Sequence, residues 1–243
     1  MNKIEYQRMA SREKNYWWHL GRLRIVETYI KKISNDRKDI KILNVGCGTG
    51  GTISLLEKYG RVENVDISDD AIAFMRQNGF KNVSKVTGIE LPYNDNEFDI
   101  IVALDVLEHI EDDSKALNEW RRVLKPRGNI LITVPAYQWL WTSHDTSLQH
   151  FRRYTVTSLR SRAAEVRLTA VRQSYAFVFS LPLVVSFRFL NKLLGRKVTE
   201  DTSYVDVPNG VNNLFTRFLY LEAILHRFLK FPAGTSVITL LRK

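Results

Sequence analysis

Residues 41–51, KILNVGCGTGG, carry four glycines within six residues, directly after an apolar run. Glycine lets the backbone take turns and close approaches that other residues resist, but elsewhere it costs conformational entropy. An apolar strand followed by such a turn and a helix also directs backbone amides and a helix N-terminus toward one point. We therefore expect a ligand that carries phosphate or adenosine to approach this turn closely.

Apolar, strand-like runs alternate with helical patterns on both sides of the turn. Strands are expected at residues 40–45, 62–67, 82–88, 98–104 and 129–135, with two later strands at 168–177 and 235–243. Helices are expected within residues 1–39 and at 52–60, 68–79, 112–124 and 157–165. Alternation at this spacing is typical of an α/β fold, in which a doubly wound, mostly parallel sheet carries helices on both faces.

An acidic residue stands at the end of the second expected strand. Asp66 lies twenty residues beyond Gly46. Gly46, Gly48 and Gly51 match the spacing G-x-G-x-x-G. A carboxylate in this position accepts hydrogen bonds from ribose hydroxyls. These residues alone fit NAD as well as other adenosine-bearing cofactors, so the choice between them stays open at this point.

Four stretches of the chain occur in the order typical of one enzyme family. They are ILNVGCGTG (42–50), VDIS (65–68), LPYNDNEFDIIVALDVLEHIED (91–112) and LKPRGNILITVP (124–135). With them the chain resembles the class I S-adenosylmethionine-dependent methyltransferases over residues 40–135. The resemblance implies a Rossmann-like sheet of seven strands, the last of them antiparallel. It also implies a methyltransferase (EC 2.1.1.-) that uses S-adenosyl-L-methionine and releases S-adenosyl-L-homocysteine.

The resemblance implies cofactor contacts where the first two strands end. Gly46, Cys47 and Gly48 are expected to line the methionine part and the ribose of the cofactor. Asp66 is expected to bind the ribose hydroxyls. Ile67, the next residue, is expected to pack on the adenine ring.

Further cofactor contacts are implied after the third and fourth strands. Gly88, Ile89 and Glu90 follow the third strand and are expected to border the adenine edge. Leu104 and Asp105 end the fourth strand. Both are expected to face the cofactor from the carboxyl edge of the sheet, which is the usual ligand crevice of this architecture.

Two positions depart from the family pattern. Asn44 stands where the family usually has an acid, two residues before the first glycine, so no charge opposes the sulfonium and ammonium groups there. Ile89 stands where an acid often contacts the adenine amine, and Glu90 can substitute for it. The first departure keeps open a non-catalytic adenosine-cofactor-binding protein on the same fold.

The N-terminal helices, residues 1–39, are expected to form a lid over the cofactor. Trp17 lies within the aromatic stretch NYWWHLGRLR (15–24) and can cover the sulfonium by a cation–π contact. Arg22 can pair with the cofactor carboxylate. The alternative for the tryptophans is simple packing against the edge of the sheet.

The segment after the fifth strand, residues 136–155, is the expected substrate loop. His150 or His144 can act as the general base that deprotonates an acceptor hydroxyl, with Asp145 orienting the imidazole. The loop also holds three candidate substrate-binding residues, namely Arg152, Arg153 and Tyr154. A single cysteine excludes a multi-cysteine metal site, and no metal site is expected.

Positive charge is concentrated in the last 93 residues. Residues 151–243 hold 15 Lys+Arg and 5 Asp+Glu, whereas the remainder of the chain is balanced. The insertion at 178–231 contains basic amphipathic patterns, with Arg188, Lys192 and Arg196 four residues apart. Such helices either lie on an anionic membrane or cap the active site. Both possibilities favour a hydrophobic or lipid-linked acceptor over a very small polar one. The leading hypothesis is methylation at oxygen of a small or hydrophobic/lipid-linked acceptor.

A single methyltransferase domain is expected over the whole chain. Its parts are an N-terminal lid (1–39), a cofactor-binding core (40–135), a substrate loop with a late strand (136–177), a helical cap insertion (178–231) and a last strand (235–243). One cysteine, no signal-peptide pattern and no apolar run of about 20 residues predict a cytoplasmic protein, peripheral at a membrane if the basic helices bind lipid.

Two other activities are weighed against methyl transfer. An NAD-dependent oxidoreductase shares the glycine turn, but no Tyr-x-x-x-Lys pair follows the fourth or fifth strand. A nucleic-acid methyltransferase or binder is suggested by the basic end of the chain. It is disfavoured because no base-methylation motif and no RNA-binding module is recognisable.

Overall fold

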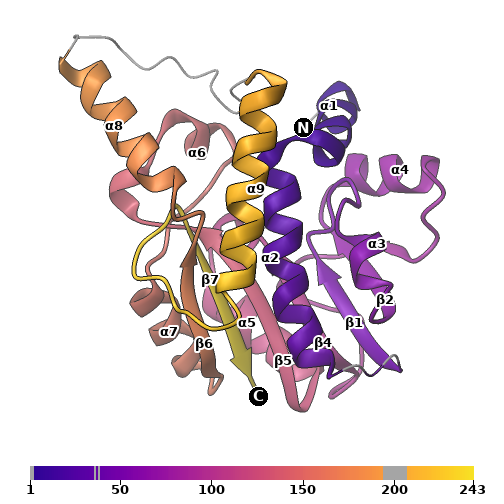
Figure 1. The fold of residues 1–243 in the computed structure, drawn as a ribbon. Helices are drawn as coiled ribbons and strands as arrows, with labels where there is room; N and C mark the ends of the chain where they lie inside the picture. Colours follow the sequence, from indigo (N-terminus) through magenta and orange to yellow (C-terminus); the bar gives the residue numbers. More distant parts are fainter. Residues whose placement is uncertain (1–2, 36, 38, 194–206) are drawn as a thin grey trace.

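Seven strands form one mixed sheet in the computed structural model, which describes residues 3–35, 37, 39–193 and 207–243 (Figure 1). The strand order is β3-β2-β1-β4-β5-β7-β6, and β7 runs antiparallel to both of its neighbours. The strands are β1 (Ile40–Val45), β2 (Gly60–Asp66), β3 (Val83–Lys85), β4 (Phe98–Leu104), β5 (Leu124–Pro135), β6 (Thr169–Ala176) and β7 (Ser236–Arg242). The predicted Rossmann-like α/β fold with an antiparallel last strand is confirmed.

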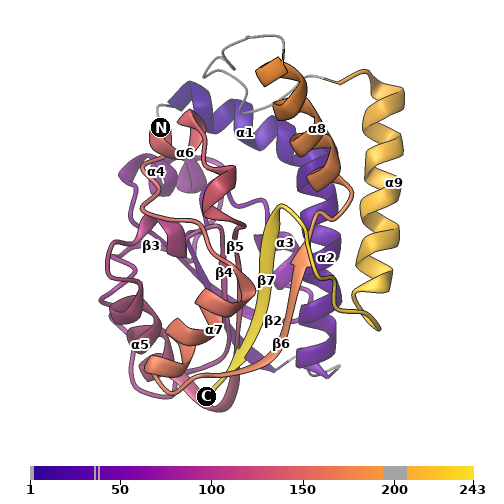
Figure 2. The same cartoon turned by 90° about the vertical axis from the view of Figure 1, so that its left-hand side faces the viewer.

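Helices cover both faces of this sheet (Figure 2). One face carries α2 (Trp17–Ser34), the short α3 (Ile53–Leu56) and α9 (Asn209–Leu225). The opposite face carries α5 (Asp113–Val123) and α7 (Val156–Glu165). The sheet is therefore the middle of three layers, and its side chains alternate between two apolar cores.

Helices α2 and α9 lie side by side in both views, although almost two hundred residues separate them in the chain. Gly21 permits this approach, because a Cβ there would overlap the side chain of Leu219. Thr28 Oγ1 also donates to the Ala223 carbonyl at 3.2 Å. Helices α2 and α9 are thus packed in one layer.

The central strands β1 and β4 are buried on both faces of the sheet. Every residue of β4 except Asp99 is buried, and so is every residue of β1 except Lys41. Parallel strands covered on both faces need such continuous apolar runs. Their carboxyl ends meet at one edge, so the segments that follow β1, β2, β4 and β5 converge there.

Several elements differ in length from the sequence-based expectation; the strand expected at 82–88, for example, is reduced to β3. The helix expected at 52–60 is reduced to α3, because β2 already begins at Gly60. A Cβ on Gly60 would overlap the carbonyl oxygen of Ile40, so glycine is needed where β2 starts to pair. Strand β5 begins five residues earlier than expected, because Leu124 pairs with Phe98 ahead of a register shift.

The remaining helices surround the carboxyl edge of the sheet. They are α1 (Lys3–Asn15), α4 (Asp69–Gln77), η1 (Leu107–His109), η2 (Gln138–Leu140), α6 (Ser143–Ser147) and α8 (Ser180–Leu193). None of the helices in the described ranges combines the length and apolar content needed to cross a membrane. Arg196, part of the expected basic face, lies outside the described residues, as does the side chain of Lys192.

Candidate functional site

The glycine turn after β1 is pinned to the end of β2. The amides of Gly46 and Cys47 both donate to the Val65 carbonyl, at 2.8 and 3.1 Å. Gly46 and Gly48 have φ angles of 69° and 53°, the left-handed region that glycine enters without a steric penalty. A Cβ on Gly48 would find its nearest neighbour among the described residues in Met9 Cε of α1, at 3.8 Å. Gly48 therefore leaves a backbone cradle that α1 covers.

Asp66 is held beside this turn by two backbone amides. Its Oδ2 accepts from the Gly48 amide at 2.8 Å and its Oδ1 accepts from the Ser68 amide at 3.0 Å. Each carboxylate oxygen keeps capacity for a further donor, such as a hydroxyl. The neighbouring Ile67 is 65% exposed, which is unusual for a large apolar side chain directly after a buried strand. An open groove of about 510 Å³ is lined by Ile67, Lys85, Val86, Thr87, Glu90, Leu91 and Pro92.

Residues after β3 and β4 divide between this groove and the core. Glu90 is exposed in the groove, as expected for a residue at the adenine edge. Gly88 accepts a hydrogen bond from the Trp120 indole at 2.9 Å through its carbonyl, and Ile89 is half-buried against the core. Leu104 is 8% exposed and packs in the core on the α2 face. The expected contact of Leu104 with the cofactor stays a prediction.

The Asn44 side chain is buried between β1, β2 and the residue that follows the glycine turn. The residue is 2% exposed, and its Nδ2 donates to Asn64 Oδ1 at 2.9 Å and to Thr52 Oγ1 at 3.3 Å. The amide thus joins β1 to β2 inside the fold. An uncharged group suits this position, because a buried carboxylate next to Asn64 would need a charged partner.

A carboxylate reaches the glycine turn from a different element, α1. A Cβ on Gly51 would overlap the Glu13 carboxylate, so this glycine leaves room for the acid. Burial raises the pKa of Glu13, and a hydrogen bond with Thr49 and the charge of Arg22 act in the opposite direction. Sequence reasoning missed Glu13, since no local pattern shows that α1 folds back over the turn.

Trp17 lies in an aromatic cluster rather than over the turn. Its ring centre is 5.7 Å from that of Phe179 and 5.3 Å from that of Phe215. These partners precede α8 and belong to α9, so Trp17 joins the N-terminal helices to the insertion. Trp17 is thus packed, as the alternative had it, but with aromatic residues of the insertion; its expected cation–π contact with the cofactor stays a prediction.

Arg22 reaches the end of β4 from α2. Its Nη1 lies 2.8 Å from Asp105 Oδ2, and its guanidinium carbon lies 4.8 Å from the ring centre of Trp18. Asp105 Oδ1 accepts from Thr133 Oγ1 at 3.2 Å. Both expected cofactor contacts, Arg22 and Asp105, therefore stand at the carboxyl edge, where they are paired with each other.

In the expected substrate loop, the structure pairs Asp145 with His150. His150 Nδ1 lies 2.9 Å from Asp145 Oδ1, and Arg153 binds both oxygens of this carboxylate, at 2.7 and 2.8 Å. Burial alone would raise the pKa of Asp145, but hydrogen bonds from His150 and Arg153 hold it well below its ordinary value. An imidazole held through Nδ1 leaves its Nε2 for another partner. His144 is half-buried, and burial lowers its pKa, but Asp145 orients His150 instead.

The three predicted substrate-binding residues are committed to internal partners. Arg153 binds Asp145, as just described. Arg152 donates to the Ile110 carbonyl at 3.2 Å and lies 3.0 Å from Asp113 Oδ2. The Tyr154 hydroxyl is buried and donates to Asp113 Oδ2 at 2.9 Å. Arg152 and Tyr154 fasten the loop to α5, and substrate binding by these three residues stays a prediction.

The same loop brings His150 against η1. The Phe151 amide donates to the Glu108 carbonyl at 2.8 Å, and the rings of His109 and His150 are 4.5 Å apart between centres. Burial, and then the nearby charge of Asp105, raise the pKa of the Glu108 carboxyl well above its ordinary value. Sequence reasoning did not single out Glu108, although an acid beside a histidine directly after a buried strand was a usable signal.

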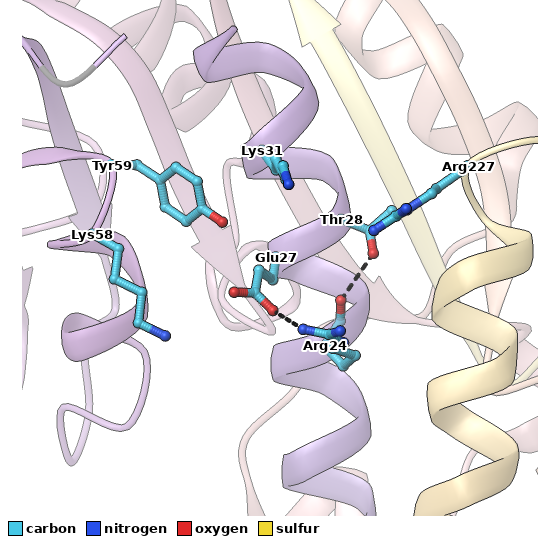
Figure 3. A pocket seen from close by; sticks show the side chains of 7 residues that line it. All are labelled: Arg24, Glu27, Thr28, Lys31, Lys58, Tyr59 and Arg227. Carbon is cyan, nitrogen blue, oxygen red and sulfur yellow. Dashed lines mark hydrogen bonds and ion pairs between the residues drawn. The ribbon is translucent and has the colours of Figure 1, made fainter. Parts of the chain in front are cut away.

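A second hollow is lined by residues of α2 and of the segments beside it (Figure 3). This polar pocket of about 310 Å³ is lined by Arg24, Glu27, Thr28, Lys31, Lys58, Tyr59 and Arg227. Tyr59 directly precedes β2, so the pocket lies toward the amino ends of the strands. It is thus remote from the edge where the glycine turn, Asp66 and Asp105 converge.

Residues 43–132 match the family model described as a methyltransferase domain. The chain is 30% identical over 150 residues to a ubiquinone biosynthesis O-methyltransferase of Rickettsia bellii, covering 55% of this chain and 62% of that protein. It is 35% identical over 112 residues to a demethylmenaquinone methyltransferase of Staphylococcus aureus, covering 42% and 46% of the two chains. The chain thus spans less than two thirds of the length of these curated relatives.

A solved structure shares the fold over nearly its whole length. A SAM-dependent methyltransferase from Archaeoglobus fulgidus superposes with a TM-score of 0.59 at 18% identity. The match covers 97% of this chain and 99% of that one.

Proposed function

We propose that the chain is a class I S-adenosylmethionine-dependent methyltransferase and that it methylates an oxygen of a small hydrophobic acceptor. The observation that carries this proposal is the convergence at one sheet edge. The glycine turn, the Asp66 carboxylate and the exposed Ile67 side chain follow β1 and β2. Asp105 and the His150–Asp145 pair follow β4 and β5.

The residues present fit S-adenosylmethionine, the methyl donor of this family. The open backbone at Gly48 would accept the methionine part, and Asp66 would accept hydrogen bonds from the ribose hydroxyls. The exposed face of Ile67 would pack on the adenine, with Glu90 at the groove beside it. Arg22, now paired with Asp105, is the cation proposed to meet the cofactor carboxylate.

Bound S-adenosylmethionine supplies an already activated methyl group, so the protein mainly has to align and protect the reacting atoms. Helix α1 covers the turn with Met9 and Glu13, which limits the access of water. His150 is the proposed base for an acceptor hydroxyl, because Asp145 holds its Nδ1 and leaves its Nε2 to accept a proton. His144 lacks this orientation by Asp145, so we assign it no part in proton transfer.

The insertion supports a hydrophobic acceptor. Exposed apolar side chains are frequent on α8 and α9, where they include Leu183, Phe187, Phe189, Leu190, Leu214, Phe218 and Leu221. Exposed apolar surface on this scale is typical of sites that bind apolar ligands or lipid. Arg188 of α8 donates to the carbonyls of Trp139 and Leu140, which fastens this helix to the substrate loop. The insertion thus adjoins the loop that carries His150.

A calorimetric titration tests the cofactor. We expect S-adenosylhomocysteine to bind with a defined stoichiometry and NAD not to bind. Asp66→Ala should weaken binding by about 1–3 kcal/mol, because the ribose hydroxyls lose a charged acceptor. Tight binding of NAD alone would support the oxidoreductase alternative and overturn the proposal.

A methyl-transfer assay tests the acceptor class. Labelled S-adenosylmethionine is offered with phenols and catechols that either carry or lack a prenyl tail. We expect transfer to hydroxyl oxygen, with a lower KM for the tailed compounds. Leu221→Glu on α9 should raise that KM, whereas Val171→Glu, an exposed apolar position on β6, should leave it unchanged. Cofactor binding without transfer to any acceptor would favour the non-catalytic alternative.

Liposome pelleting separates membrane contact from simple capping of the site. If the basic insertion binds an anionic membrane, the protein should pellet with vesicles containing phosphatidylglycerol at low salt and be released at high salt. Neutral vesicles serve as the control. Absence of pelleting at low salt would leave the insertion as a cap for the acceptor.

A further inference from the structure

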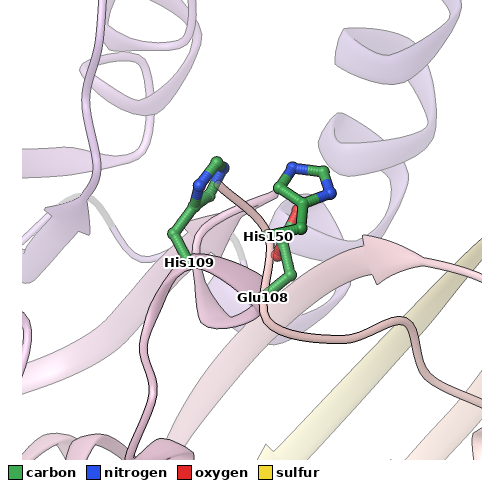
Figure 4. Close-up of side chains that lie close together, drawn as sticks. All are labelled: Glu108, His109 and His150. Atoms are coloured by element: carbon green, nitrogen blue, oxygen red, sulfur yellow. The ribbon is translucent and has the colours of Figure 1, made fainter. Parts of the chain in front are cut away.

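Three side chains with metal-ligand chemistry face one another beside the proposed methyl-transfer site (Figure 4). Glu108 and His109 belong to η1, directly after β4, and His150 comes from the loop after β5. One ligand atom from each residue lies within 4.8 Å of those of the other two. Two segments some forty residues apart in sequence thus present two imidazoles and one carboxylate to a common point.

The carboxylate of Glu108 is buried without a complete set of partners. The residue is 1% exposed, and its Oε2 has no hydrogen-bond partner among the described residues. Buried polar atoms are normally paired, because removing them from water without compensation is costly. A cation at the common point would provide the missing partner for this oxygen.

His150 is oriented as metal-binding histidines usually are. Its Nδ1 is bonded to Asp145, which leaves Nε2 as the nitrogen available to a cation. Asp145 is itself fixed by Arg153 on both oxygens. A carboxylate behind the imidazole sets the ring orientation and raises the basicity of the ligand nitrogen.

The approach of the two segments is also fixed by the backbone. The Phe151 amide donates to the Glu108 carbonyl at 2.8 Å, which ties the residue after His150 to the residue before His109. Arg152 holds the next position of the loop through the carbonyls of Ile110 and Glu111, at 3.2 and 2.6 Å. The three candidate ligands are therefore held by the fold rather than by chance side-chain rotation.

We propose that Glu108, His109 and His150 bind one divalent transition-metal ion. Two nitrogens and one carboxylate oxygen suit Zn²⁺, Mn²⁺, Fe²⁺ or Co²⁺ better than Ca²⁺ or Mg²⁺, which prefer oxygen ligands. Three protein ligands also leave positions open for a further ligand, as in catalytic metal sites. This proposal departs from the expectation, made from the sequence, that the chain has no metal site.

The role of the ion rests on the proposed function, whereas its binding does not. An open coordination position would hold the acceptor hydroxyl beside the methyl donor. The ion would lower the pKa of that hydroxyl, so its proton would pass to solvent. The role of base proposed above for His150 would then apply to the metal-free protein alone, because in the metal-bound protein the same Nε2 is a ligand.

Calorimetric titration of the full, chelator-treated chain with Zn²⁺ tests the site directly. We expect saturable binding of one ion. Glu108→Gln and His150→Asn should each weaken it by at least about tenfold. His144→Asn, a change of the same kind in the same loop but outside the cluster, should bind as the parent protein does. Circular dichroism of each variant verifies that it is folded.

Two results would overturn the proposal. One is the absence of saturable Zn²⁺ binding to the folded parent chain. The other is unchanged affinity in both Glu108→Gln and His150→Asn. Methyl transfer that continues at full rate in the metal-free protein would remove the role given to the ion. Failure to find any methyl acceptor would instead concern the proposed function, because the binding measurement does not depend on turnover.

Discussion

Arg22 Nη1 lies 2.8 Å from Asp105 Oδ2, so a residue of the second helix closes onto the carboxyl end of strand β4. The two side chains are 12% and 24% exposed. Asp105 has a φ of 57°, in the left-handed region, and Thr133 Oγ1 donates to its other carboxylate oxygen. A non-glycine residue persists in this conformation where surrounding contacts fix it, as they often do at binding sites.

We expect Arg22→Met to weaken binding of S-adenosylhomocysteine and to lower the free energy of unfolding by about 1–3 kcal/mol. The substitution leaves the Asp105 carboxylate largely buried without its cation and removes the proposed partner of the cofactor carboxylate. Calorimetry and urea unfolding measure the two effects. Arg22→Lys keeps the charge and should recover part of both. Unchanged binding in Arg22→Met would exclude Arg22 from the cofactor site.

Gly46→Ala and Gly79→Ala form a matched pair of glycine substitutions. Both residues have positive φ angles, 69° and 87°, so each alanine should cost about 1–2 kcal/mol of stability. At Gly46 the new Cβ would also overlap Val106, whereas at Gly79 none of the described atoms beyond its chain neighbours lies within 4 Å. We expect Gly46→Ala alone to abolish S-adenosylhomocysteine binding. Equal loss in both variants would show that the effect is one of stability.

The sheet could be predicted from the sequence because its signals are local. The apolar runs at 40–45 and 98–104 give β1 and β4 with the expected bounds. A strand buried on both faces of a sheet is a continuous apolar run, which can be identified without knowing its neighbouring strands. The position of Asp66 at the end of β2 followed from the apolar run expected as the second strand. The carboxyl edge as the place of the site then follows from the parallel arrangement.

Pairings between distant segments could not be predicted in the same way. From the sequence, Asp145 could orient either His144 or His150. In the structure the turn that ends α6 brings His150 to Asp145. The polar residue Tyr154 looked suited to substrate, but α5 supplies a buried acceptor forty-one positions away. The burial of Glu108 depends on the packing of the loop 136–155 against η1. The local sequence pattern of η1 does not indicate that contact.

The single cysteine, Cys47, should react very slowly in the folded protein. It is 5% exposed, and burial, followed by the charge of Asp66, raises the pKa of its thiol to about 12. Because the thiolate is the reactive form, alkylation by iodoacetamide at pH 8 should be on the order of 1,000-fold slower than in denaturant. Mass spectrometry follows the reaction, with Cys47→Ser as the background control. Similar rates with and without denaturant would contradict this burial.

His19 should make the stability of the protein depend on pH. The residue is 2% exposed; burial, and then the positive charge of Arg22, lower the pKa of its imidazole to about 3. Its ordinary pKa is about 6.5, so between these values the unfolded chain binds the extra proton. The free energy of unfolding therefore falls as the pH drops below 6.5, by about 1.4 kcal/mol per unit from this residue, and the contribution is fully present above that pH.

Urea unfolding at pH 7.5, 6 and 5 measures this dependence in the parent protein and in His19→Gln. Glutamine has a similar size and does not titrate, so the variant should be less stable than the parent at pH 7.5. The gap should narrow by about 2 kcal/mol at pH 5, because only the parent loses the contribution of a neutral imidazole. Parallel curves for the two proteins would show that His19 is protonated in the folded state at pH 5, contrary to its burial in the structure.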